Sequence, residues 1–459
     1  MQESANGILD KTIRRLVPLW RDAQGSRRIL DKLSLNPDLG TDDARILLKW
    51  MDACLADDGG EVAARVRAAT LGRSFLALNK GGRIRFLTLL ADNYSTDEAA
   101  VEVAIERWMQ ADSQQRTDAG LRLRHALEPP RMKLLTQFNE LPEGIKFLVD
   151  MRAELLSLKK DHPNLSPLEA DLKRLLSAWF DVGLLQLEQI SWQSSAELLE
   201  KLIAYEAVHA IQGWGDLKNR LNSDRRCFAF FHPNMPNEPL IFVEVALVNG
   251  LADNVQQLLD EEVPVLDIGE ADTAIFYSIS NAQKGLAGIS FGNFLIKRVV
   301  KQLQHEFPHL KHFSTLSPIP GFNRWLEHSD DDQLRQLPGG KAWLDTPKPR
   351  RPNGKQTAVI NPELSEGLLS LASHYLYAQK RNSTYAMDPV AHFHLSNGAQ
   401  IARLNWMADS SDKGLRQASG MMVNYLYELP KIESRSQQYT SIGDICLSTQ
   451  LKKRLKKPR

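Results

Sequence analysis

The stretch from 273 to 322 constrains the fold more than any other part of this 459-residue chain. Its first residues, Thr273 to Ser280, are a short run of β-formers and aromatics, which predicts a buried strand. After a glycine-bearing loop, apolar residues recur every three or four positions and predict a helix that ends before Pro308, because proline cannot continue a helix. These apolar residues are Leu295, Ile296, Val299, Val300 and Leu303. A second strand, from about Leu310 to Leu316, then delivers Ser317 to its carboxyl end, where open α/β sheets bind their ligands.

The loop between this strand and this helix matches a catalytic pattern letter for letter. Gly288, Ser290 and Gly292 satisfy G-x-S-x-G, the nucleophile elbow of serine hydrolases. An elbow serine sits on the turn directly after its strand, whereas here the segment 281–287 intervenes. The loop fits better a cradle in which backbone N–H groups and the N-terminus of the next helix, capped by Asn293, hold a phosphate. On pattern alone, an ordinary glycine-bearing turn is equally compatible with these residues.

A second match, to the zinc-binding pattern H-E-x-x-H, is rejected. That pattern binds zinc because two histidines one turn apart share a face of a helix. Pro308 stands between His305 and His309 and ends the helix before the second histidine. We therefore expect no zinc site here.

The overall composition excludes several classes of function. Lysine and arginine number 57 against 56 aspartates and glutamates, so the net charge of +1 gives no general attraction to nucleic acid or to an anionic membrane. The sequence contains no apolar run long enough to span a bilayer, and its first residues lack the apolar core of a signal peptide. The three cysteines, Cys54, Cys227 and Cys446, lie far apart and show no metal-binding spacing. We therefore expect a cytoplasmic protein in a reducing compartment, and an inter-subunit disulfide stays open.

The chain is longer than a single core usually organises, so we expect two domains. Residues 1–180 have helical patterns without a catalytic constellation, and we predict a helical assembly or scaffolding domain there. One predicted helix starts near Thr41, and another starts at a capping box formed by Ser95 and Glu98. We expect the apolar stripes of both helices in the core. The stripes are Ile46, Leu47, Trp50, Met51 and Leu55 in the first helix, and Val101, Ile105, Trp108 and Met109 in the second.

Residues 181–459 carry a mixed pattern of strands and helices. Two β-rich apolar runs within 227–251 are separated by a connector with proline and asparagine, which is typical of a hairpin. The segment 345–362 is rich in proline, lysine and arginine and predicts an exposed loop, and 365–380 predicts a helix. We therefore predict an α+β fold, with an all-helical N-terminal domain followed by a mixed α/β catalytic domain.

Several long ungapped segments of the sequence resemble the malonyl-CoA decarboxylase family. They are FYSIS (276–280), FLIKRVVKQLQ (294–304), LSPIPGF (316–322), DPVAHFHLSNGAQIARLNWMAD (388–409) and GMMVNYLY (420–427). The resemblance implies a catalytic half similar to the GNAT acyltransferase fold, in which acyl-CoA lies across a turn between strand and helix and its pantetheine enters a gap between splayed strands. It also implies decarboxylation of malonyl-CoA to acetyl-CoA through a thioester enolate, with no cofactor and no metal, in a homo-oligomer that is a dimer or a tetramer.

The resemblance further assigns roles to individual residues. His394 matches the family's proton donor to carbon, a role that suits the ordinary pKa of histidine, and Ser317 either orients the carboxylate or relays the proton. Without the family, Ser317 is a turn serine before proline, and His394 is a structural histidine in a strand-like segment whose face His392 shares. Ser278 and Tyr427 match further substrate-pocket positions. The expected CoA cradle consists of Ala287, Gly288, Ile289, Ser290, Phe291, Gly292 and Asn293.

Two other functions stay open beside the decarboxylase. A CoA-dependent acyltransferase would use the same cradle, and a catalytically silent sensor would bind acyl-CoA. Dependence on an acyl acceptor distinguishes the transferase, and tight binding without turnover distinguishes the sensor. We expect malonyl-CoA as substrate, and neither nucleic acid nor a membrane as a partner.

Overall fold

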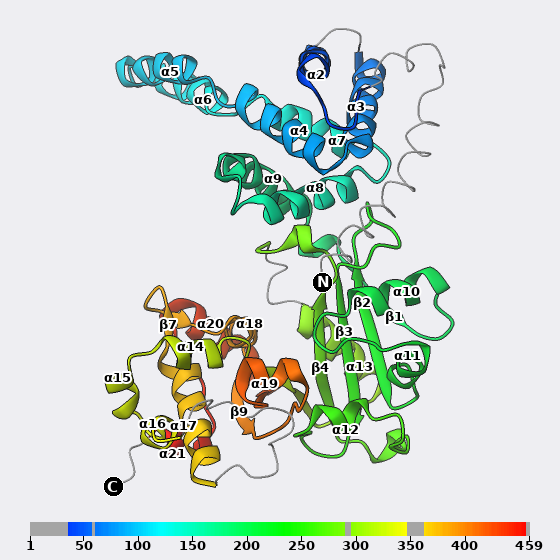
Figure 1. The fold of residues 1–459 in the computed structure, drawn as a ribbon, viewed down its shortest axis with the longest axis vertical. Coiled ribbons are helices and arrows are strands. Elements are labelled where there is room, and N and C mark those ends of the chain that lie inside the picture. The colour runs from blue at the N-terminus through cyan, green and yellow to red at the C-terminus, as the bar shows by residue number, and fades with distance from the viewer. Residues whose placement is uncertain (1–34, 57–59, 290–294, 347–361, 456–459) are drawn as a thin grey trace. The chain divides into compact units, whose positions relative to one another are not determined.

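The computed structural model describes residues 35–56, 60–289, 295–346 and 362–455, and it divides into two units, each with its own core (Figure 1). The helical unit comprises Met1–Leu184 together with the short segments His232–Pro236 and Gln283–Ser290. The sheet unit comprises Leu185–Phe231, Asn237–Ala282 and Phe291–Arg459. None of the described helices combines the length and the apolar character that crossing a membrane requires.

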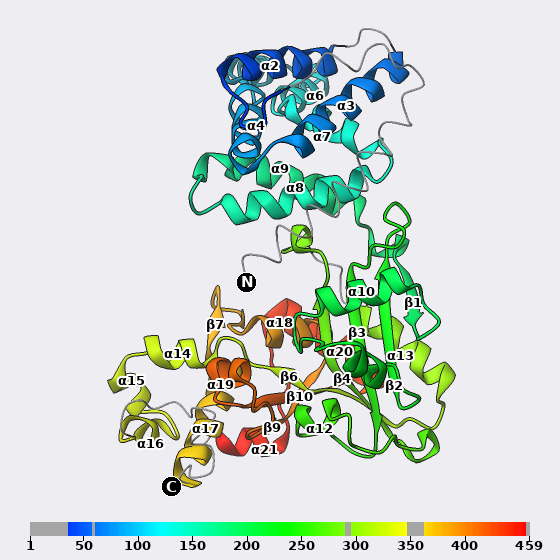
Figure 2. The same cartoon turned by 45° about the vertical axis from the view of Figure 1, so that its right-hand side comes forward.

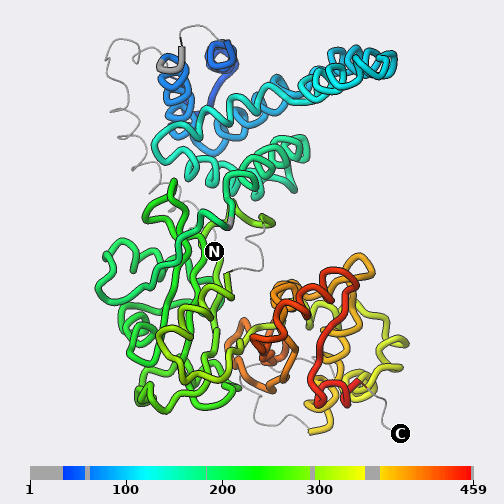
Figure 3. Tube along the Cα trace, turned by 180° about the vertical axis from the view of Figure 1, so that it is seen from behind, coloured from blue at the N-terminus to red at the C-terminus, as the bar shows by residue number. Residues whose placement is uncertain are grey.

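The helical unit is built around a helix that is buried on nearly all sides, α8 (Gly144–Leu158). Charged side chains on this helix are paired within the unit. Arg152 binds Glu169 at 2.8 Å, and Glu154 binds Arg83 at 2.8 Å. The other helices are α2 (Thr41–Leu55), α3 (Gly60–Ala77), α4 (Lys80–Asn93), α5 (Glu98–Gln110), α6 (Arg116–Ala126), α7 (Arg131–Asn139) and α9 (Ser166–Trp179), with 3-10 turns η2 (Pro163–Leu165), η3 (Val182–Leu184) and η5 (Lys284–Leu286). Figure 3 follows them from blue to green along the chain.

Two predictions about these helices are wrong in part. The start of α2 at Thr41 is confirmed, but α5 is capped by Asp97, which accepts a hydrogen bond from Ala100 N at 3.1 Å, and not by a capping box from Ser95. The apolar stripe of α5 that is predicted for the core lies largely at the surface, with Met109 68% exposed. Helix α5 packs on α6 as a hairpin (Figure 1), and the residue it buries is the small Ala104. On α2, Leu47 and Met51 are buried as predicted, whereas Ile46 is 42% exposed.

The sheet unit alternates strands and helices, which confirms the predicted α+β fold. The strands are β1 (Gln186–Ile190), β2 (Arg225–Phe231), β3 (Ile241–Val248), β4 (Thr273–Asn281), β5 (His312–Thr315), β6 (Ser317–Pro318), β7 (Lys380–Arg381), β8 (Tyr385–Ala386), β9 (Gln400–Asn405) and β10 (Met422–Leu426). The helices are α10 (Ala196–Tyr205), α11 (Trp214–Arg220), α12 (Val255–Leu259), α13 (Leu295–Glu306), α14 (Phe322–His328), α15 (Asp331–Arg335), α16 (Gly340–Leu344), α17 (Pro362–Ala378), α18 (Pro389–Ser396), α19 (Asp412–Ala418), α20 (Ile432–Ile442) and α21 (Thr449–Arg454), with 3-10 turns η4 (Ile268–Glu270) and η8 (Leu429–Lys431).

The main sheet of the described chain has the strand order β1-β2-β3-β4-β5-β10-β6, and β9 also pairs with β10. The predicted hairpin is confirmed as the antiparallel pair β2 and β3, and the predicted first strand is β4. Helices α10 and α11 cover one face of β1 to β3. Helix α13, seen beside the strands in Figure 2, covers the other face, where the Arg298 guanidinium lies 5.8 Å from the ring centre of Phe230. All five apolar positions predicted for α13 are buried, and the helix ends at Glu306.

The parallel pair β4 and β5 separates partway along its length. The two strands pair from Thr273 to Phe276, whose partner is Thr315, and Leu316 N donates the last bond to Phe276 O at 3.0 Å. Beyond that point β4 continues along β3 to Asn281, whereas the chain after β5 turns into β6 and pairs with β10. An opening between splayed strands results, as the resemblance to the GNAT fold predicts.

The core under this sheet is expected to be sensitive to loss of volume. Leu303 on α13 is fully buried, so Leu303→Ala should lower the free energy of unfolding by about 2–5 kcal/mol through lost burial and the cavity it leaves. Lys301→Ala, at an exposed position of the same helix, should change it by less than about 0.5 kcal/mol. Urea unfolding followed by circular dichroism measures both, and equal effects would contradict the packing described for α13.

Candidate active site

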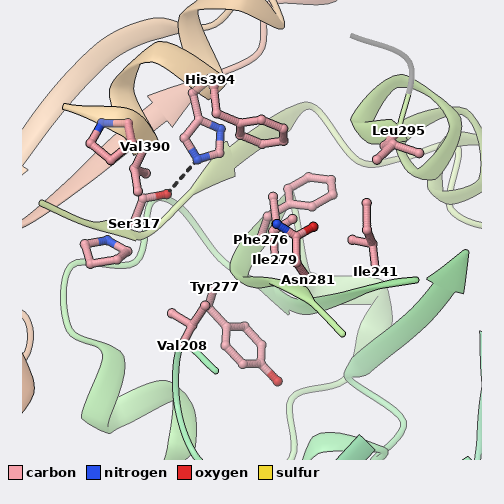
Figure 4. Close-up of a pocket in the computed structure, with 13 residues that line it drawn as sticks. Val208, Ile241, Phe276, Tyr277, Ile279, Asn281, Leu295, Ser317, Val390 and His394 are labelled. Atoms are coloured by element: carbon pink, nitrogen blue, oxygen red, sulfur yellow. Dashed lines mark hydrogen bonds between the residues drawn. The ribbon is translucent and has the colours of Figure 1, made fainter. Parts of the chain in front are cut away.

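A pocket occupies the opening between the splayed strands (Figure 4). Its walls come from β4, β6 and α18, and from single residues of neighbouring segments. The lining consists of Val208, Ile241, Phe276, Tyr277, Ile279, Asn281, Leu295, Ser317, Pro318, Pro389, Val390, Phe393 and His394. Most of these side chains are apolar, so a polar group of a ligand entering the pocket meets few hydrogen-bonding partners.

His394 reaches the pocket from a helix, and not from a strand as its sequence suggested. Asp388 caps α18 and Pro389 occupies its first turn, where a proline is tolerated because the N–H it lacks has no partner there. Residues four apart then share a face, so Pro389 and Phe393, and likewise Val390 and His394, all line the pocket. The strand prediction for this segment is therefore wrong.

Ser317 and His394 form the polar centre of the pocket. Ser317 Oγ lies 3.1 Å from His394 Nε2 (Figure 4). Ser317 Oγ also donates to Thr315 Oγ1 at 2.8 Å, and His394 Nδ1 lies 2.8 Å from the Tyr427 hydroxyl. A serine has one hydroxyl proton. Because Ser317 gives that proton to Thr315, Nε2 of His394 must carry the hydrogen of its bond to Ser317, and Tyr427 must donate to Nδ1. The chain of bonds thus fixes one tautomer of the imidazole.

The imidazole of His394 is held neutral by its surroundings. The side chain is 3% exposed, and burial lowers its pKa to about 3. Tyr425 stacks on the ring, with 4.5 Å between ring centres, and fixes its plane. The expectation that an ordinary pKa makes His394 a ready acid is therefore wrong for the unliganded protein, although a neutral imidazole still offers an N–H.

Ser278 and Tyr427, predicted as pocket donors, both lie behind the pocket wall. Tyr427 contacts His394, as described, and Ser278 Oγ donates to the buried carboxylate of Glu206 at 2.8 and 2.9 Å. Glu206 also accepts the backbone N–H groups of Val208 and His209, so Ser278 supports the turn that brings Val208 to the pocket. A direct contact of Ser278 or Tyr427 with a substrate stays a prediction.

The predicted CoA cradle is described only in its first part. Ala287, Gly288 and Ile289 belong to the helical unit, whereas Ser290, Phe291, Gly292 and Asn293 lie outside the described residues, and with them the nucleophile-elbow serine and the predicted helix cap. Gly288 has φ +72°, a conformation that favours glycine. Arg152 binds the carbonyl groups of Gly285 and Ala287, the latter at 2.9 Å, and so fixes the backbone that leads into the cradle.

The remaining histidines of the sequence patterns do not converge on the pocket. His305 lies in the last turn of α13, and His309 follows the helix and has Nε2 3.0 Å from Ile268 O, so the two share no helix face. His392 Nδ1 contacts the Tyr439 hydroxyl at 2.8 Å. Since His392 and His394 lie two positions apart on a helix, the shared face expected from a strand is wrong.

Sequence reasoning missed three residues around the polar centre, Thr315, Tyr425 and Asp388. Thr315 precedes Ser317 by two positions, and this spacing on an extended segment signals a shared face. The dipeptide Asp388-Pro389 is a helix-start signal that was available in the sequence. Nothing in the local sequence indicates that Tyr425 stacks on an imidazole from another element.

Comparison with known proteins places this architecture among relatives. The model "Malonyl-CoA decarboxylase N-terminal domain" matches residues 94–180, and "Malonyl-CoA decarboxylase C-terminal domain" matches 183–459. The mitochondrial malonyl-CoA decarboxylase of Anser anser anser is 38% identical over 420 residues, covering 84% of this chain and 83% of the relative, and that of Rattus norvegicus is 37% identical over 423 residues, covering 86% and 82%.

Solved structures give the same result. The malonyl-CoA decarboxylase of Rhodopseudomonas palustris has a TM-score of 0.83 at 40% identity, covering 89% of this chain and 99% of that one. The malonyl-CoA decarboxylase of Agrobacterium vitis has a TM-score of 0.78 at 38% identity, covering 90% and 100%. The resemblance read from the sequence is confirmed.

The neutral state of His394 predicts a pH dependence of stability. Folding lowers the pKa of His394 from 6.5 to about 3. Between these two values the unfolded chain binds a proton at His394 and the folded chain does not, so the folded protein loses stability as pH falls below 6.5. Relative to His394→Asn, the wild-type protein should lose about 1.4 kcal/mol of unfolding free energy between pH 7.5 and 5.5. Urea unfolding at the two pH values measures this, and His209, whose pKa burial also lowers, contributes equally to both proteins. Parallel pH dependences would contradict the neutral state.

Proposed function

Because the chain belongs to the malonyl-CoA decarboxylase family, we propose that it converts malonyl-CoA to acetyl-CoA and carbon dioxide at the pocket between β4 and β6. Membership of the family makes the protein a carboxy-lyase. The observation that carries the assignment of the site is the hydrogen bond between Ser317 and His394 in a mostly apolar pocket.

The reaction places three demands on such a pocket. The bond between the carboxylate carbon and the α-carbon breaks, its electron pair moves into the thioester to form an enolate, and carbon dioxide leaves. The α-carbon then receives a proton and becomes the methyl group of acetyl-CoA. The protein must therefore orient the carboxylate, stabilise the enolate oxygen and supply the proton. The thioester carbonyl is itself the electron sink.

The apolar lining favours loss of the carboxylate. A carboxylate is poorly solvated among Ile279, Val390 and Phe393, whereas carbon dioxide is neutral and the enolate charge is spread over the thioester. Removal of the carboxylate charge therefore proceeds in the direction that the pocket favours. The few polar groups then decide where the carboxylate sits.

We assign His394 as the donor of the proton to the α-carbon. We assign to Ser317 either the placement of the carboxylate or the relay of that proton. A malonyl carboxylate beside the imidazole would raise the pKa of His394, opposing the effect of burial, so the substrate itself promotes the acid form. Tyr427 acts on the substrate through the imidazole, to which it donates at Nδ1. Ser317 Oγ, bonded to both Nε2 and Thr315, lies where either role is open to it.

The CoA phosphates are assigned to the loop 287–293, with Ser278 retained as a polar residue of the substrate region. Support for the loop comes from the left-handed Gly288, which lets a ligand approach the backbone, and from Arg152, which binds the carbonyl groups preceding it.

Assembly as a homo-oligomer and a cytoplasmic location complete the proposal. The first rests on the family resemblance, and the second rests on the composition.

One assay tests the reaction. The purified protein is incubated with malonyl-CoA without an acyl acceptor, and carbon dioxide and acetyl-CoA are measured together. Release of both in equal amounts supports the decarboxylase. Turnover that depends on an added acceptor would replace it by an acyltransferase, and binding without turnover would replace it by a sensor.

Replacement of the proton donor should slow the chemical step. His394→Asn should lower kcat by about 10²- to 10⁴-fold, the usual effect of losing a general acid, while KM for malonyl-CoA changes much less. His328→Asn, at an exposed histidine of α14, is the control and should keep wild-type kinetics. Steady-state assays of acetyl-CoA formation decide, and wild-type turnover in His394→Asn would remove this residue from the mechanism.

Removal of the serine hydroxyl should separate its two candidate roles. Ser317→Ala should lower kcat by at least about tenfold, because a bond in the chain to the imidazole is lost. If Ser317 orients the carboxylate, the variant should bind malonyl-CoA and acetyl-CoA with more similar affinity. If it relays the proton, affinity should persist while deuterium incorporation into the acetyl methyl group slows. Ser329→Ala, at the C-terminal end of α14, is the control, and unchanged kcat in both variants would refute a role for Ser317.

A further inference from the structure

A buried carboxylate links the two elements that carry Ser317 and His394. Asp388 has no exposed surface, and its two oxygens have different partners. Oδ1 accepts the N–H groups of Val390 and Ala391 at 3.0 Å each, which caps α18. Oδ2 accepts the N–H of Gly321 at 3.3 Å, in the corner that follows Ser317. One side chain thus holds the start of the histidine helix and the corner after the serine strand.

The corner is shaped to approach this carboxylate closely. A Cβ atom at residue 321 would lie 2.1 Å from the Tyr375 hydroxyl and 3.5 Å from Asp388 Oδ2, so a larger residue there would displace the Tyr375 side chain. Tyr375, from α17, lies beside the same carboxylate. Burial is the main cause that raises the pKa of the Tyr375 hydroxyl, and the charge of Asp388 is the second cause. Desolvation raises the pKa of Asp388 to about 6, although the hydrogen-bond donors around the carboxylate act to lower it. Because this pKa lies below 7, the carboxylate keeps its charge at neutral pH.

The link lies well away from the catalytic pair along the helix. Asp388 precedes His394 by six residues, which corresponds to about 9 Å along a helix axis. The bond between Ser317 and His394 joins the two elements at one point, and the bond between Gly321 and Asp388 joins them at a second. Helix α18 is also held by α20, where the Tyr439 hydroxyl contacts His392 Nδ1. Relative to the serine segment, however, two separated bonds restrict the direction of α18 more than one bond does.

We propose that Asp388 is a positioning residue, whose carboxylate ties the Gly321 corner to α18 and thereby keeps Ser317 and His394 at hydrogen-bonding distance. The inference rests on the reaction proposed above. Asp388 does not line the pocket, so its effect on turnover passes through the pair and not through contact with substrate. A displacement of about 1 Å between catalytic groups lowers rates by about 100-fold in enzymes generally, which sets the scale of the expected effect.

Two substitutions separate this role from ordinary helix capping. Asparagine and serine are good N-cap residues, so Asp388→Asn and Asp388→Ser keep an oxygen for the amides of Val390 and Ala391. Neither supplies the second carboxylate oxygen that Gly321 needs. A matched control exists in α15, where Asp330 Oδ1 accepts two amide hydrogens in the same way, from Asp332 and Gln333, but at an exposed position.

The experiment measures kcat, KM for malonyl-CoA, and thermal unfolding of Asp388→Asn, Asp388→Ser and Asp330→Asn. We expect kcat to fall about 10- to 100-fold in both 388 variants, with KM within about threefold and a melting temperature within about 4 °C of wild type. Asp330→Asn should match the wild type in all three. Folded 388 variants with wild-type kcat would overturn the inference, and so would a loss of activity that only follows loss of the fold.

A second readout keeps this inference separate from the proposed reaction. Nitrogen-15 NMR of the histidine side chains reports the bond between His394 Nε2 and Ser317 without any substrate. Its resonance should shift in both 388 variants and stay in place in Asp330→Asn. A wild-type protein that releases no carbon dioxide would refute the reaction, whereas an unmoved His394 resonance in the 388 variants would refute the link.

Discussion

The separation of β4 from β5 after Phe276 determines what the rest of the sheet unit is able to do. A continuous ladder would pair the backbone from Tyr277 to Asn281 on both sides and fill the space with side chains of the neighbouring strand. Because no ladder pair follows Phe276 and Thr315, that edge of β4 faces the pocket instead. The chain after β5 is then free to turn into β6, and its first residue is the serine of the catalytic pair.

The polar centre sits in this apolar opening under a constraint of its own. Buried imidazole is tolerated when it is neutral and when both of its nitrogens have partners, and His394 meets both conditions through Ser317 and Tyr427. Stacking on Tyr425 removes the freedom of the ring to tilt. The ring is therefore ordered before a substrate binds. Because a carboxylate beside the imidazole would raise its pKa, binding of a charged substrate would change the protonation of His394.

The sequence predicted elements well where the pattern is local. Periodicity placed β4, the β2–β3 hairpin and α13, because each carries a strong pattern of buried residues along its own length. It failed where one local pattern overrides another and where the outcome depends on distant segments. The alternation in HFHL resembled a strand, yet the Asp388 cap and Pro389 begin a helix there, and a bulge opposite Glu244 and Val245 places the consecutive residues Phe276 and Tyr277 both in the pocket lining. Ser317 and His394 are 77 residues apart and meet where helix α18 contacts β6, which no spacing rule describes, and only the family resemblance named them together.

The shortness of α18 limits how the chain can vary around the site. The helix has eight residues, and His394 lies in its last turn, so the position of the imidazole is counted directly from the Asp388 cap. Each residue of a helix turns the chain by about 100°, so one residue inserted or deleted between the cap and His394 would point the ring away from Ser317. Insertions and deletions among related chains should therefore be found before the cap or after the helix. The number of residues between Asp388 and His394 should stay constant.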